Sequence, residues 1–128
     1  MNRAFLFALR IGAPFILSVM AAVAAVRAQP SYSGGILVNA DGMTLYVFDR
    51  DVAGSGRSAW RGQGTNLWLP ARAKPEVTAV EPFSILERED GTRQWAYKGK
   101  PLYLYAGDRR PGERSGDNFK NIWHIVRN

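Results

Sequence analysis

Few residues of this 128-residue chain have side chains able to carry out covalent chemistry. The chain has no cysteine and one histidine, His124, and no Gly-x-Ser-x-Gly elbow accompanies that histidine. These absences argue against nucleophilic catalysis. His124 lies in an apolar segment, where a lone histidine is more often a hydrogen-bonded structural residue than a base or a ligand. It is nevertheless the best single candidate for a functional side chain.

Carboxylates at the start of two glycine-rich loops are the candidate metal ligands. Asp49 and Asp51 open the first loop, but an EF-hand requires a glutamate at its twelfth position, and counting from Asp49 that position is Trp60. Asp108 opens the second loop, where arginines close in sequence would repel a cation. We therefore predict no metal site and no cofactor.

Asp51 and Asp108 also allow two other roles. A glycosidase needs two acids that converge across a cleft, and the equivalent positions of these two aspartates in a repeat would permit that. An aspartate at the point where a strand gives way to a loop more often accepts hydrogen bonds from backbone N–H groups. The second, structural role is the favoured interpretation.

The elements that must position these residues are short strands. Apolar or aromatic runs separated by Gly and Pro turns predict strands over 36–38, 44–48, 83–88, 94–97, 102–105 and 122–126. Asp41-Gly42 predicts a hairpin between the first two, and loops are expected over 49–66 and 106–120. The fold class is all-β: a small single domain of short antiparallel strands built from two related repeat units, after an N-terminal signal helix.

Two stretches of the chain have matching sequences at an offset of 57 residues. Residues 42–51 and 99–108 both reduce to Gly-x-x-Leu-Tyr-x-aromatic-x-x-Asp, and each is followed by a loop and a tryptophan. Alternation places the two rings of each motif on one face of a strand and apolar residues on the other, so both motif strands should be central. The candidate motif residues are Tyr46, Phe48, Asp51, Trp68, Tyr103, Tyr105, Asp108, Trp123 and His124.

The twin motifs, Trp68-Leu69-Pro70, the run at 90–103 and Trp123-His124 closely resemble the bacterial secreted-repeat, or predicted-lipoprotein, family named for its Tyr-x-aromatic-x-x-Asp motif. The resemblance covers about 36–126. It implies an envelope or secreted location and a small repeated β unit, with no established activity. Many members carry a cysteine pair before the Trp-Pro, where this chain has Trp60 and Gly64, so redox and thiolate-metal roles are excluded here.

The N-terminal sequence predicts export. Arg3 and Arg10 precede or flank a neutral stretch over 11–26, which is shorter than the roughly 20 residues that span a bilayer. Val26-Arg27-Ala28 fits a cleavage site, so we predict a signal peptide over 1–28, with an uncleaved anchor as the alternative. The chain has no cysteine to carry a lipid, so we expect a periplasmic or secreted protein that is not a lipoprotein and has no membrane span after cleavage.

The remaining chain is predicted as a flexible lead-in over 29–35 and a duplicated β domain over 36–128, with repeat one at about 36–70 and repeat two at about 83–126. Residues 1–28 contain three arginines and no acid, so their removal lowers the net charge from +6 to +3. Basic residues still follow both motifs, and symmetry could join them into one cationic rim: Arg57, Arg61, Arg72 and Lys74 in the first half, and Arg109, Arg110, Arg114 and Lys120 in the second.

Export argues against nucleic acid as a partner. An anionic envelope component, such as a glycan or lipid head group, or an acidic protein fits the basic loops; a solvated surface with interspersed acids is the alternative. We favour a non-catalytic binding or structural module. The second hypothesis is a ligand or metal site that uses His124 and the motif aspartates, and the third is an envelope hydrolase. Complete burial of the motif rings and local capping of both aspartates would make the motif a folding signature.

Overall fold

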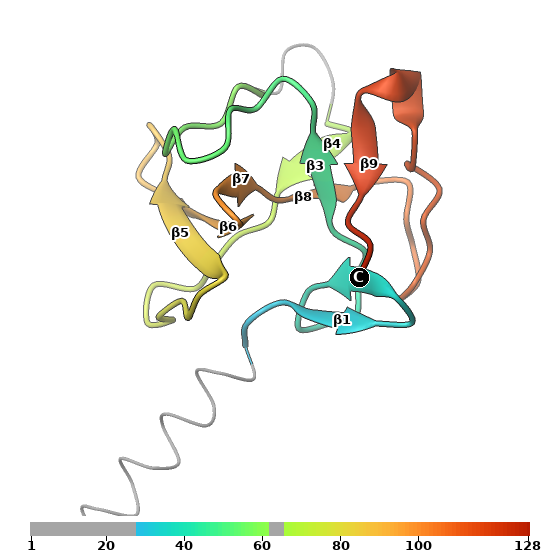
Figure 1. Cartoon of the computed structure of the whole chain (residues 1–128), viewed down its shortest axis with the longest axis horizontal. Coiled ribbons are helices and arrows are strands. Elements are labelled where there is room, and N and C mark those ends of the chain that lie inside the picture. The colour runs from blue at the N-terminus through green and yellow to red at the C-terminus, as the bar shows by residue number, and fades with distance from the viewer. Residues whose placement is uncertain (1–27, 62–65) are drawn as a thin grey trace, which may run out of the picture.

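A computed structural model describes residues 28–61 and 66–128 (Figure 1). The predicted signal helix and Gly64 lie outside the described residues. In chain order the elements are β1 (Ser31–Ser33), β2 (Ile36–Val38), β3 (Tyr46–Phe48), β4 (Trp68–Pro70), β5 (Phe83–Glu87), β6 (Arg93–Tyr97), β7 (Lys100–Pro101), β8 (Tyr103–Tyr105), a 3-10 turn η1 (Phe119–Asn121) and β9 (Trp123–Ile125). The predicted all-β class of short antiparallel strands is confirmed.

The strands form three antiparallel sheets. The largest has the order β4-β8-β3-β9, and the others are the hairpin β1-β2 and the sheet β5-β6-β7. In Figure 1 the hairpin lies below the four-stranded sheet and the three-stranded sheet lies to its left. The motif strands β3 and β8 occupy the two central places, as predicted. Among the described residues, no helix has the length and hydropathy required to cross a membrane.

The first predicted hairpin differs from the structure in its pairing. Its turn is present, because the N–H of Gly42 donates to Asn39 at 2.9 Å and the N–H of Leu45 donates to Leu37 at 3.0 Å. Beyond that turn, however, β2 pairs with β1, while β3 leaves to pair with β8 and β9. The segment 29–35, expected as a lead-in, therefore contains a strand. In this arrangement the rings of Tyr46 and Phe48 on β3 lie in the shared aromatic core.

The two halves exchange their last strands. At the centre of the sheet Tyr46 is opposite Tyr103. Strand β4 of the first half pairs with β8 of the second, with Trp68 opposite Tyr105, and β9 of the second half pairs with β3 of the first, with Trp123 opposite Phe48. These pairings are equivalent under a pseudo-two-fold relation between the halves. Each half therefore completes the sheet of the other.

An aromatic cluster covers one side of the exchanged sheet. The rings of Trp68 and Trp123 stack in parallel, with centroids 4.0 Å apart and an interplanar angle of 1°. Phe48 stacks on Trp123 at 4.4 Å, and Tyr105 lies 4.7 Å from Trp68 with its ring tilted by 41°. Aromatic pairs of this kind contribute about 1 kcal/mol each beyond the burial of their surface. In the absence of disulfides this cluster is a principal source of stability.

Side chains bind backbone groups at both edges of the four-stranded sheet. On β4 the indole N–H of Trp60 donates to the carbonyl of Trp68 at 3.2 Å, and Pro70 has no N–H to offer. On β9 the carboxylate of Asp117 accepts the N–H of Ile125 at 3.1 Å. Unpaired edge groups invite pairing with other chains, so these contacts discourage association by edge addition.

Candidate functional site

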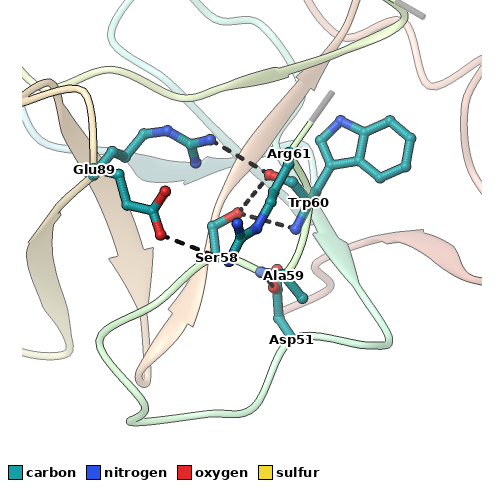
Figure 2. A network of polar contacts seen from close by, with 7 residues as sticks. Asp51, Ser58, Ala59, Trp60, Arg61 and Glu89 are labelled. Atoms are coloured by element: carbon teal, nitrogen blue, oxygen red, sulfur yellow. Dashed lines mark hydrogen bonds and ion pairs between the residues drawn. The ribbon is translucent and has the colours of Figure 1, made fainter. Parts of the chain in front are cut away.

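The first motif aspartate is the centre of a network that joins the two halves. Asp51 Oδ2 accepts the hydroxyl of Tyr103 from the second half at 2.7 Å, and Oδ1 accepts the N–H of Ala59 at 2.5 Å. The Ser58 hydroxyl lies 2.5 Å from the Tyr103 hydroxyl and donates to the carbonyl of Trp60 at 3.1 Å. We call Asp51, Ser58, Ala59 and Tyr103 the Asp51 network; Figure 2 shows its first three members.

The second motif aspartate has an equivalent network. Asp108 Oδ2 accepts the hydroxyl of Tyr46 from the first half at 2.6 Å, and Oδ1 accepts both the N–H of Ser115, at 3.0 Å, and its hydroxyl. The N–H of Gly116 donates to the Tyr46 hydroxyl at 3.2 Å. We call Asp108, Tyr46, Ser115 and Gly116 the Asp108 network. Each tyrosine is thus bound by the aspartate of the other half.

Sequence reasoning missed both the crossing and the serines. Ser58 and Ser115 each follow a motif aspartate by seven residues, so they are equivalent at the same offset of 57 as the motif itself. That repeated serine is the signal that could have extended the motif. The crossed pairing has no such signal, because either tyrosine could face either aspartate as far as the sequence shows.

Burial controls the protonation of these networks. Desolvation, followed by the hydrogen bond to Asp108, raises the pKa of Tyr46. Desolvation likewise raises the pKa of Tyr103; the hydrogen bond with Ser58 opposes this increase, and the contact with Asp51 adds to it. Burial also raises the pKa of Asp51, although the bonds from Ala59 and Tyr103 oppose it. Both tyrosines are therefore held as neutral hydrogen-bond donors.

The motif residues are mostly inaccessible. Tyr46 and Tyr103 are fully buried, Phe48 is 3% exposed, and Asp51 and Asp108 are 5% and 8% exposed. Trp68 and Trp123 are buried as well, and Tyr105 alone among the four motif rings is half-buried. Both aspartates accept N–H groups of the loops they open. This arrangement gives the motif a role in holding the halves together.

An open groove of about 720 Å³ lies beside the Asp51 network. Its residues come from both halves: Gly56, Arg57, Ser58 and Arg61 from the first loop, and Leu86, Glu87, Arg88, Glu89 and Asp90 from β5 and the turn after it. Arg88 donates to Gln94 at 2.7 Å and to the carbonyl of Trp60 at 3.4 Å, so its guanidinium is fixed. Arg61 pairs with Glu89 at 3.6 Å across largely exposed side chains (Figure 2).

Comparison with known families explains the internal equivalence. Residues 31–72 and 84–127 each match the model of a family described as a secreted repeat of unknown function. The chain belongs to this family. Each matched stretch contains one complete unit, from the outer strand through the motif strand to the tryptophan strand, and the family description supports export. No curated protein and no solved structure matches the chain.

In this secreted repeat His124 is placed away from both networks. Its Nε2 lies 2.9 Å from Asp49 Oδ2, and its Nδ1 lies 3.0 Å from Asn118 Oδ1. No hydrogen bond recorded among the described residues joins His124 to Asp51 or Asp108. Within 28–61 and 66–128 no group of three or more His, Asp or Glu side chains is arranged to hold a metal ion. With both ring nitrogens engaged, His124 has the contacts of a structural residue.

The basic loops of the secreted repeat lie apart. The first loop packs on the second half, where the N–H of Gly54 donates to Gly99 at 3.0 Å, and the second loop packs on the first half, where the N–H of Gly112 donates to Gly42 at 3.1 Å. Figure 1 shows the two loops on different sides of the four-stranded sheet. The single cationic rim considered from sequence is therefore replaced by two separate basic loops, of which the first borders the groove.

Proposed function

We propose that this secreted repeat is a non-catalytic binding module. In this proposal the twin motif is the scaffold, and the groove between the first loop and the turn after β5 binds an anionic group of an envelope component or of an acidic protein. The observation that carries the proposal is the groove itself, since it is concave, lies on the repeat boundary and is bordered by three arginines. Guanidinium groups bind carboxylates and phosphates through paired hydrogen bonds.

The charges of the groove narrow the ligand class. Arg57 and Arg61 are exposed, while Arg88 is held in place by Gln94 and Trp60. Three acidic residues, Glu87, Glu89 and Asp90, line the same groove. A simple polyanion would be repelled by them, so we infer a ligand that carries an amine or several hydrogen-bond donors beside its anionic group. Zwitterionic peptides and amino sugars have this chemistry.

The other two hypotheses have less support. His124 has no free ring nitrogen for a metal or ligand in its present contacts with Asp49 and Asn118. Asp51 and Asp108 are buried and bonded to tyrosines, whereas a hydrolase requires carboxylates that flank an accessible cleft. We also propose a periplasmic or secreted location without a lipid anchor, because the chain has no cysteine.

Titration of isotope-labelled mature protein, followed through its backbone amide signals, tests the binding proposal. The probes are the dipeptide glycylglutamate, which carries an ammonium group beside its carboxylates, and inorganic phosphate. We expect saturable shifts at Ser58 and Leu86 with the dipeptide and weaker ones with phosphate. The variant Arg57→Gln with Arg61→Gln should lose them, and the matched variant Arg109→Gln with Arg110→Gln in the second loop should keep them. Absence of saturable shifts, or equal loss in both variants, would contradict the proposal.

A further inference from the structure

The crossed contacts between the two halves can be made by halves of different molecules. We propose that two copies of this chain exchange repeats to form a closed dimer, and that Arg93 restrains the connecting segment 73–82 on which the exchange depends. The exchanging surface is the one that joins the halves in the monomer, and the partner is a second copy of the chain.

The contacts across this surface are reciprocal. Tyr46 binds Asp108 while Tyr103 binds Asp51, and β4 pairs with β8 while β9 pairs with β3. A half supplied by another copy would reproduce every one of these contacts, because each is made between the first half and the second. Exchange of identical elements is a low-cost route to a dimer since it creates no new interface. At β4 and β9 a side chain binds a backbone group of each edge strand, which disfavours edge addition to this sheet.

The connecting segment has the length and the restraint that a hinge requires. Residues 73–82 contain no strand, and ten residues extend to about 30 Å. Arg93 holds this segment to repeat two: Nη1 donates to the carbonyls of Lys74 and Pro75, each at 2.7 Å, and Nη2 donates to that of Val77 at 2.9 Å. Opening the hinge breaks these three bonds and exposes Val77, which is 6% exposed in the monomer.

Exchange would also change how the groove is built. The groove takes Arg57, Ser58 and Arg61 from the first half and Leu86 and Arg88 from the second. In an exchanged dimer each of the two grooves would therefore contain residues of both copies. A dimer of this kind presents two equivalent grooves, so a ligand with repeated groups would gain from bivalent binding.

The test uses the whole mature chain with a specific protease site inserted between Thr78 and Ala79. Isotope-labelled and unlabelled copies are unfolded together, refolded at about 1 mM, and separated into monomer and dimer, because exchange is favoured by mass action at high concentration. The dimer is then cleaved and its halves are weighed as native pairs by mass spectrometry. We expect hybrid pairs, with a heavy first half and a light second half, from the dimer and none from the monomer fraction.

Loss of the Arg93 restraint should raise the yield of exchange. Arg93→Met is expected to increase the dimer fraction at least about threefold, whereas the matched variant Arg109→Met in the second loop should leave it unchanged, because hinge substitutions promote swapping. A dimer that yields only single-isotope pairs would overturn the proposal, as would the absence of a dimer for the wild-type chain at this concentration. The wild-type result tests the proposed exchange even if Arg93→Met fails to fold.

Discussion

The Asp51 and Asp108 networks share an aspartate, a serine and a tyrosine at the same spacing but use their serine differently. Ser115 directs both its N–H and its hydroxyl to Asp108, and Gly116 adds a bond to Tyr46. Ser58 instead turns its hydroxyl toward Tyr103 and the backbone of Trp60. Both loops donate an N–H group to their own aspartate and contact the tyrosine of the other half, but the serine hydroxyl binds the carboxylate only in the Asp108 network. The loop around Asp51 also borders the groove.

The difference teaches how a duplicated unit can diverge. The residues that join the halves are the same in both units, because loss of either pair would leave a buried group without a partner. The loops outside those pairs are free to differ. The same holds for the last strands, where Leu69 of β4 pairs with Leu104 and His124 occupies the equivalent place on β9, opposite Val47.

Of the substitutions that test this comparison, removal of a carboxylate is expected to give the largest loss of stability. Asp108→Ala leaves the Tyr46 hydroxyl and two groups of Ser115 without their acceptor, and should lower the free energy of unfolding by about 3 kcal/mol. Asp51→Ala should cost about 2 kcal/mol, because Tyr103 retains its contact with Ser58. Urea unfolding measures both, and the exposed Asp41→Ala is the control. Equal losses at the two networks would show that their different bonding has no energetic consequence.

Removal of the tyrosine hydroxyls should give the next largest loss of stability. Tyr46→Phe and Tyr103→Phe each leave a buried carboxylate short of one charge-assisted bond, with an expected cost of about 2 kcal/mol. A double-mutant cycle between Tyr46→Phe and Asp108→Asn isolates the pair from the rest of the core. A coupling energy indistinguishable from zero would exclude the crossed bond as a source of stability.

Alkaline unfolding should depend on the same hydroxyls. The pKa values of Tyr46 and Tyr103 are raised in the folded state by burial and by their carboxylates, above an unfolded value of about 10. Their contribution to stability is therefore complete below pH 10 and is lost as the pH rises above it. The double variant Tyr46→Phe with Tyr103→Phe should unfold at neutral pH more readily than wild type but show a flatter decline above pH 10. An unchanged decline would contradict this assignment.

Substitution of the serines should give smaller losses of stability, which differ between the two networks. Ser115→Ala removes a hydroxyl that donates to a carboxylate and should cost about 1.5 kcal/mol, while Ser58→Ala should cost about 1 kcal/mol or less. Thermal unfolding compares them. Ser58→Ala should also alter the ligand-induced shifts in the groove, whereas Ser115→Ala should leave them intact. A larger loss of stability in Ser58→Ala than in Ser115→Ala would refute the distinction between the two serines.

The smallest effect concerns the charge of Asp51. Burial raises its folded pKa, so its stabilising contribution is fully present below the unfolded pKa near 4 and declines as the pH rises through the folded value. Asp51→Asn stays neutral throughout, and its cost relative to wild type should consequently be smaller at pH 7 than at pH 3. Chemical unfolding at the two pH values checks the sign, and a larger cost at pH 7 would contradict it.

Several elements could be read from the sequence because their signals are local. Alternating apolar residues and Asp-Gly turns placed the strands at 83–88, 94–97 and 122–126 close to β5, β6 and β9. The offset of 57 identified the two units, and the family match at 31–72 and 84–127 confirms them. The strand β1 was missed because Ser31-Tyr32-Ser33 is short and polar, and it is a strand only because β2 lies beside it.

The candidate site was less accessible to sequence reasoning. The sequence grouped the residues of the twin motif as one candidate site, but a buried ring and an exposed ring are the same residue type, so the burial of each ring could not be read from the sequence. The groove joins residues near 57 and 88 that no pattern connects. His124 was grouped with the motif aspartates, whereas the structure gives it Asp49 and Asn118 as partners.

The sequence by itself determined the duplicated unit, six of the nine strands in the described residues, the dependence on aromatic burial and the absence of thiol chemistry, since each follows from residue type and local spacing. The tertiary structure alone decided that the halves are crossed. Tyr46 and Asp108 are 62 residues apart, and Tyr103 and Asp51 are 52 apart. A repeated motif fits pairing within a unit or between units equally well, and only the register of β3 against β8, set by packing of the shared aromatic core, selects between them.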